Sequence, residues 1–137
     1  MNTLLNTSPS QQRLRVLCVD DEPAVLEGIE QHLRRRYDVR IATSGSNGLE
    51  VLEREGPFAI ILSDMRMPSM NGAVFLAKAK EKSPQSVRML LTGQTDIESP
   101  IAAINEGQIF RFLMKPCPPD RLLSIFELAA DQYRLII

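Results

Sequence analysis

The 137-residue sequence has few of the features that mark secreted, zinc-binding or membrane-spanning proteins. Its two cysteines, Cys18 and Cys117, are too few for a disulfide framework, and neither has the spacing of a zinc site. Its longest apolar runs are far shorter than the about 18 residues that a transmembrane helix needs. The first twelve residues lack the basic and the sustained apolar parts of a signal peptide. We therefore expect a cytoplasmic protein without a membrane partner.

The sequence also lacks an excess of either charge, with 16 lysines and arginines against 17 aspartates and glutamates. This balance gives no bulk electrostatic reason to bind a phosphate backbone, so we expect no direct contact with nucleic acid. The one basic run, Arg34 to Arg36, is assigned to the last turn of a predicted helix, where cations interact favourably with the helix dipole. The only histidine, His32, has no neighbouring cysteine or histidine with which to share a metal, and is expected to be solvated.

The length fits one domain with a full hydrophobic core. Residues 1–12 are polar, and we expect them to form a disordered tail before a domain at 13–137. The last predicted helix ends abruptly in an apolar segment. We therefore favour the hypothesis that the sequence is a piece of a longer protein.

Short β-branched apolar runs alternate with longer stretches of helical period, which is typical of βαβ units around a parallel sheet. Three of the runs are almost wholly apolar, as expected for strands covered on both faces. The sequence therefore predicts an α/β fold, with a doubly wound, five-stranded parallel sheet in three α/β/α layers. The strands are predicted at 15–19, 39–42, 59–63, 88–91 and 110–114, and the helices at 23–36, 46–55, 72–82, within 96–106, and at 119–135.

The fourth helix is predicted to begin near Ser99, because Pro100 is tolerated in the first turn of a helix but not in its interior. Residues 92–98 then form a long loop, which we expect to be mobile.

Charged and hydroxyl side chains gather where the predicted strands end. Asp20 and Asp21 follow the first strand, and Asp64, Thr92 and Lys115 follow the third, fourth and fifth. Ligands of doubly wound sheets bind at this edge, so these side chains should converge there. Clustered carboxylates repel one another unless a hard cation such as Mg²⁺ shares their oxygens. Asp64 could then attack phosphorus, with Lys115 and Thr92 stabilising the phosphoryl oxygens.

A simpler interpretation is that the acidic residues after the first strand only cap the following helix. Helix capping explains one strand end but not four. We therefore favour the convergent site.

Residues 13–137 resemble the receiver domain of two-component response regulators. The matching segments are VLCVDDEP, ILSDMRMPSMNG, MLLTG and FRFLMKP, which fall in this order at four predicted strand ends. The resemblance implies a flavodoxin-like (βα)5 fold. It also implies a signalling switch, in which Asp64 accepts a phosphoryl group from a sensor histidine kinase in a Mg²⁺-dependent step.

The resemblance also implies a role for each site residue. Asp21, Asp64 and the carbonyl of Arg66 would ligate Mg²⁺ directly, whereas Asp20 would act largely through metal-bound water. Lys115 would pair with the acceptor carboxylate and then with the phosphoryl group.

Further residues are implied to transmit or tune the signal. Thr92 would turn toward the phosphoryl group and Phe112 would rotate inward behind it. This movement would change the surface of the fourth helix, fifth strand and fifth helix, where an output domain, an effector or a second copy binds. Arg66 departs from the family pattern by placing a large cation at the mouth of the site, and we expect it, with Gln94, to tune the lifetime of the phosphoaspartate. The bond before Pro116 is implied to be cis, and a cis peptide costs little only before proline.

Two alternatives remain open at this point. One is a Mg²⁺-dependent phosphohydrolase with an aspartate nucleophile, although enzymes similar to the haloacid dehalogenases carry a second aspartate where Arg66 stands. The other is an interaction module that is not phosphorylated, although the acceptor, acidic residues and lysine are all present. We expect no enzymatic turnover beyond self-catalysed phosphotransfer and autodephosphorylation.

Overall fold

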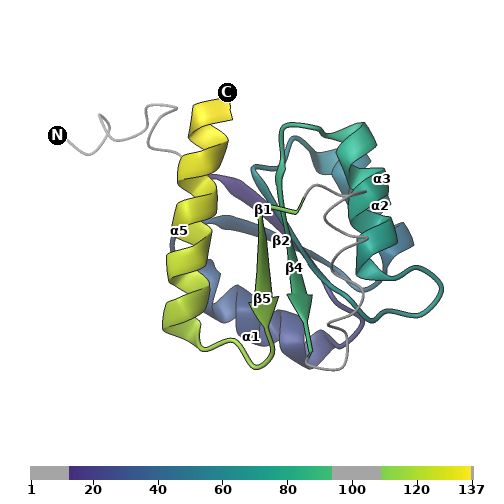
Figure 1. Cartoon of the computed structure of the whole chain (residues 1–137), viewed down its shortest axis with the longest axis horizontal. Helices are drawn as coiled ribbons and strands as arrows, with labels where there is room; N and C mark the ends of the chain where they lie inside the picture. The colour runs from purple at the N-terminus through teal and green to yellow at the C-terminus, as the bar shows by residue number, and fades with distance from the viewer. Residues whose placement is uncertain (1–12, 94–108, 137) are drawn as a thin grey trace, which may run out of the picture.

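The computed structural model describes residues 13–93 and 109–136 (Figure 1). Strands and helices alternate along the chain, as the sequence predicts. Their bounds are β1 (Arg15–Val19), α1 (Pro23–Leu33), β2 (Asp38–Ala42), α2 (Gly45–Glu55), β3 (Ile60–Asp64), α3 (Gly72–Lys82), β4 (Val87–Thr92), β5 (Arg111–Met114) and α5 (Pro119–Ile136).

The five strands form one sheet in the order β2-β1-β3-β4-β5, and every neighbouring pair is parallel. This order confirms the predicted flavodoxin-like fold, in which the chain winds outward in both directions from the first strand. Every residue of β3 and β4 is buried, because helices cover both faces of the sheet centre. The carboxyl ends of β1, β3, β4 and β5 therefore share one edge.

Two hydrophobic clusters lie on opposite faces of the sheet. Val16 and Cys18 of β1 belong to the cluster that packs against α1 and α5, around Phe126. Leu17 and Val19 alternate with them and belong to the other cluster, which packs against α2 and α3. Figure 1 shows the sheet between these pairs of helices. The three-layer prediction is confirmed.

Helix α1 ends earlier than predicted, at Leu33. The backbone N–H groups of Arg36 and Tyr37 both bond to the carbonyl of Leu33, so the chain turns there and the buried Tyr37 packs against Phe126. Arg34 is the C-cap, and the next two arginines lie in the turn that follows. The assignment of the arginine run to the last helical turn was wrong.

Several predicted features lie outside the described residues. They are the N-terminal tail at 1–12, the loop from Gln94 onward and the fourth helix. The division into tail and domain stays a prediction. Within the part of the chain that is described, no helix combines the length and hydropathy needed to cross a membrane.

Candidate functional site

Backbone hydrogen bonds extend the sheet beyond its strands and thereby fix the predicted site residues. The N–H of Asp20 bonds to the carbonyl of Ala42, at 3.1 Å, which continues the ladder between β1 and β2. Beside β4 and β5, on the opposite side of the sheet from β2, the N–H of Lys115 bonds to the carbonyl of Thr92, at 2.9 Å. This bond continues the ladder between these two strands. Asp64 is the last residue of β3, the strand between them. The backbone thus brings Asp20, Asp64 and Lys115 to the same edge of the sheet.

The centre of the site is an ion pair between β3 and the end of β5. Lys115 Nζ lies 2.7 Å from Asp64 Oδ1 and 3.9 Å from Asp20 Oδ2. Asp20 and Asp64 are only 1% and 4% exposed, so the lysine stabilises two charges that water barely reaches. One cation thus faces two buried carboxylates.

Asp20 is the less satisfied of the two buried carboxylates. Its Oδ1 accepts a hydrogen bond from the N–H of Glu22 at 2.9 Å, whereas Oδ2 is buried and has no hydrogen-bond partner in the described ranges. Burial raises the pKa of Asp20 to about 6, and the nearby charge of Asp64 adds to this effect against the opposing Glu22 hydrogen bond. The site therefore contains a carboxylate oxygen that lacks a ligand.

The pKa values of the other two groups follow from the same geometry. Burial raises the pKa of Asp64, although the hydrogen bond and charge of Lys115 oppose the rise. Partial burial alone would lower the pKa of Lys115, but the hydrogen bond to Asp64 and the charges of both buried aspartates outweigh it and leave this pKa raised.

Asp20, Asp21 and Asp64 each offer a carboxylate oxygen, and these oxygens lie within 4.8 Å of one another. Three acids and one lysine leave an excess of negative charge. Asp21 is exposed and opens the cluster to water. Oxygen donors that leave room for water suit a hard divalent cation, and such an ion would also satisfy the orphaned oxygen of Asp20. The donor set therefore fits such an ion.

The loop between β3 and α3 holds the end of β3 in place. A Cβ atom on Gly72 would lie 2.2 Å from the carbonyl oxygen of Asp64, so only glycine allows this approach. The N–H of Gly72 bonds to the carbonyl of Met65 at 2.8 Å, and the side chain of Asn71 caps α3 by accepting a bond from Val74. The contacts of Asn71 and Gly72 were not predicted from the sequence, although an Asn-Gly pair before a helix is a recognisable signal.

The remaining predicted residues surround this centre. Thr92 is buried and its hydroxyl donates to the carbonyl of Gly93 at 3.1 Å. Phe112 is half-buried against the cluster on the α2 and α3 face. Arg66 is exposed after β3, and the Lys115–Pro116 bond is cis, as the resemblance implies. Gln94 falls outside the described residues.

Comparisons with known proteins agree with this geometry. The family model for the response regulator receiver domain matches residues 16–127. The hydrogenase transcriptional regulatory protein HoxA of Cupriavidus necator is 34% identical over 122 residues, which are 89% of this chain and 25% of HoxA. The DNA-binding transcriptional regulator NtrC of Escherichia coli is 30% identical over 125 residues, 90% of this chain and 26% of NtrC. The chain thus spans about a quarter of the length of these curated relatives.

Two solved structures share the fold over more than nine tenths of their own chains. A CheY-like receiver domain protein from Methanospirillum hungatei superposes with a TM-score of 0.85 at 31% identity, covering 90% of this chain and 98% of that one. A chain described as adenylate cyclase from Rhodopirellula baltica gives a TM-score of 0.86 at 37% identity, covering 91% and 93%.

We expected no direct contact with nucleic acid. The relatives do not support this expectation, since NtrC is described as DNA-binding. They do support the resemblance from which the site was assigned. The sheet order, the acidic cluster beside Lys115 and the match over residues 16–127 lead to one assignment. The chain belongs to the response regulator receiver domain family, whose members are signalling domains of two-component systems.

Proposed function

We propose that this chain is a phosphorylation-dependent switch in which Asp64 accepts a phosphoryl group from a phosphohistidine of a sensor histidine kinase. The observation that carries the proposal is the 2.7 Å contact between Asp64 Oδ1 and Lys115 Nζ beside two further carboxylates. The lysine fixes the carboxylate in one orientation, and its charge favours an incoming phosphoryl group.

The acidic cluster would hold Mg²⁺. Asp21, Asp64 and the carbonyl of Arg66 would be direct ligands, with Asp20 acting largely through water. When bound, the ion supplies positive charge beside the phosphoryl oxygens, which phosphoryl transfer needs more than it needs acid or base catalysis.

The transfer itself uses the carboxylate as a nucleophile. An oxygen of Asp64 forms a bond to phosphorus while the bond between phosphorus and the imidazole nitrogen breaks. The electron pair of the broken bond returns to the imidazole nitrogen, which takes a proton from water. Lys115 stays beside the new phosphoryl group and neutralises part of its charge.

The switch would begin at Thr92. Its hydroxyl, which now donates to the Gly93 carbonyl, would donate instead to a phosphoryl oxygen, and Phe112 would move inward. The surface formed by the fourth helix, β5 and α5 would change as a result. Met114 and Leu128 are 42% and 46% exposed on β5 and α5, and they offer apolar contacts to an output domain, an effector or a second copy.

Two residues, chosen by their positions in the sequence, would set the lifetime of the phosphorylated state. Arg66 is exposed two residues after Asp64, and Gln94 is two residues after Thr92. We expect substitution of either one to change the rate at which water hydrolyses the phosphoaspartate.

The test uses acetyl phosphate as a small phosphodonor, with and without Mg²⁺. We expect the intact mass to rise by one phosphoryl group in the presence of the metal and not in its absence. An Asp64→Asn variant should show no gain, while an Asp120→Asn variant, which changes an exposed aspartate on α5, should behave like the original chain. A gain by the Asp64→Asn variant would contradict the assignment.

The same incubation separates the two alternatives. With a phosphomonoester such as p-nitrophenyl phosphate in place of acetyl phosphate, steady release of phosphate over many turnovers would indicate a phosphohydrolase, because autodephosphorylation alone already turns over acetyl phosphate. No metal-dependent mass gain, with the fold intact, would indicate an interaction module without phosphorylation.

A further inference from the structure

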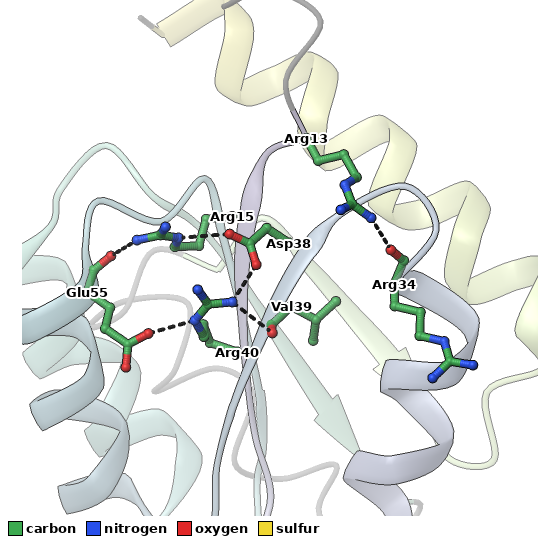
Figure 2. Close-up of polar contacts among 7 residues, drawn as sticks. All are labelled: Arg13, Arg15, Arg34, Asp38, Val39, Arg40 and Glu55. Atoms are coloured by element: carbon green, nitrogen blue, oxygen red, sulfur yellow. Dashed lines mark hydrogen bonds and ion pairs between the residues drawn. The ribbon is translucent and has the colours of Figure 1, made fainter. Parts of the chain in front are cut away.

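Six of the twelve arginines in the chain form one group at the end of the domain opposite the aspartate cluster. These arginines come from three segments that meet where β1 and β2 begin and α1 ends. Figure 2 shows four of the six arginines. We call this surface the arginine corner. It consists of Arg13, Arg15, Arg34, Arg35, Arg36 and Arg40.

Half of the arginine corner is neutralised by neighbouring carboxylates. Arg15 lies 3.3 Å from Asp38, and Arg40 bonds to the same aspartate and to Glu55, the latter at 2.6 Å (Figure 2). Outside the figure, Arg36 Nη1 lies 2.6 Å from the carboxylate of Glu127 on α5. These three arginines are therefore explained by the fold.

The other half has no such explanation. Arg13, Arg34 and Arg35 are exposed, and none has a carboxylate partner within 4 Å among residues 13–93 and 109–136. The guanidinium of Arg13 donates to the backbone carbonyl of Arg34 at 2.6 Å, which places the Arg13 charge beside the end of α1, whereas the Arg34 side chain extends away from this contact (Figure 2). The corner carries three uncompensated positive charges, although the whole chain has a net charge of -1.

The position of this arginine run differs from the prediction. It begins at the C-cap of α1 and continues into the turn that follows, and the carbonyl groups of Glu30, Leu33 and Arg34 are bonded by backbone N–H groups and by Arg13. The helix dipole therefore accounts for Arg34 at most. Within the described chain, the side chains of Arg34 and Arg35 form no hydrogen bond or ion pair.

Two separate hollows lie near the arginine corner. One, of about 490 Å³, is lined by Arg13, Arg15, Asp38 and Pro57. The other, of about 460 Å³, includes Arg36 and Arg134 together with their acidic partners Glu127 and Asp131. Only the first contains an uncompensated arginine, Arg13. Guanidinium groups pair bidentately with phosphate oxygens, which lysine cannot do.

We propose that the arginine corner binds the phosphate backbone of double-stranded DNA. The arginine corner contains no large hydrophobic side chain that the described structure exposes. The nearest one is Ile41, which follows Arg40 along β2. A protein interface has an apolar centre, whereas contact with a phosphate backbone depends almost entirely on charge. The binding is independent of sequence and adds to the proposed switch without using the aspartate site.

The test measures fluorescence anisotropy of a labelled duplex of about 20 base pairs, titrated with the 137-residue chain at about 50 and about 200 mM salt. Neutralising three phosphates gives a logarithmic salt dependence of about -2.7, so affinity should fall roughly 40-fold between the two conditions. An Arg34→Gln/Arg35→Gln variant should bind more weakly at low salt, with the slope reduced to about -0.9. A Lys78→Gln/Arg121→Gln variant, which loses the same charge from α3 and α5, should bind like the original chain.

Three results would overturn the proposal. They are no binding of the duplex at low salt, an equal loss of affinity in both double variants, and displacement of the duplex by polyglutamate at equal charge, which would indicate an acidic protein partner. Phosphorylation of the Arg34→Gln/Arg35→Gln variant by acetyl phosphate should be unchanged, so this proposal and the proposed function fail independently. Circular dichroism checks that both variants are folded.

Discussion

Replacing Asp20 by asparagine should make the metal-free protein more stable. The structure buries this carboxylate and leaves its Oδ2 without a hydrogen-bond partner in the described chain, so the charged form is disfavoured. Its pKa rises from 3.8 to about 6 on folding. At about 1.36 kcal/mol for each pKa unit, the ionised group destabilises the fold by roughly 3 kcal/mol at pH 7.5. Asparagine removes the charge and keeps the shape.

The sign of the pH dependence follows from the raised pKa. Between pH 3.8 and about 6 the folded protein binds more protons at Asp20 than the unfolded chain does, so stability falls as the pH rises through this range. The advantage of the Asp20→Asn variant should therefore be complete above about pH 6 and shrink to under about 1 kcal/mol near pH 4.

Urea unfolding in the presence of EDTA, followed by circular dichroism at pH 7.5 and pH 4, measures this difference. An Asp21→Asn variant is the matched control, because it removes a charge from the same cluster but from an exposed side chain, and should gain less. The reasoning is refuted if the Asp20→Asn variant is no more stable than the original chain at pH 7.5, or if its advantage is the same at both pH values.

Three further predictions concern the same edge of the sheet. A Gly72→Ala variant should lose about 1–3 kcal/mol in urea unfolding because its Cβ would meet the Asp64 carbonyl at 2.2 Å, whereas Gly28→Ala, where a Cβ meets nothing within 4 Å, should gain about 0.5–1 kcal/mol; equal effects would contradict the packing argument. A Lys115→Ala variant should keep the fold, with its circular dichroism unchanged, but lose the chemical-shift response to beryllofluoride; a full response would show that the ion pair is dispensable. Mg²⁺ affinity, measured by calorimetry, should fall roughly tenfold from pH 8 to pH 5, because protonation of Asp20, with its pKa of about 6, competes with the metal; a constant affinity would remove Asp20 from the ligand set.

The sequence predicts the sheet well because apolar runs and turn residues are local signals. The bounds of α3 agree at both ends, since Asn71 caps its start and charged residues mark its finish. The end of α1 could not be predicted, because it depends on the packing of Tyr37 against Phe126 on a helix about ninety residues away in the chain. The pattern of charges alone therefore misassigned the arginine run.

The site residues could be predicted because strand order brings their strand ends to one edge. Their energetics could not. The folded structure is needed to see that Lys115 Nζ lies 2.7 Å from Asp64 Oδ1 but 3.9 Å from Asp20 Oδ2. The buried Oδ2 of Asp20 is therefore left without a hydrogen-bond partner in the described chain. The close approach of Gly72 to the carbonyl of Asp64 is likewise a tertiary feature, since it joins the start of one helix to the end of the preceding strand.

The most direct test of the account is to locate the modified residue after phosphorylation. Borohydride reduces an aspartyl phosphate to homoserine, which tandem mass spectrometry reads at a single position. After incubation with acetyl phosphate and Mg²⁺, we expect homoserine at position 64 and unmodified aspartate at positions 20 and 21. Homoserine at another position, or none at 64 in a sample that gained the phosphoryl mass, would contradict the assignment of Asp64 as the acceptor.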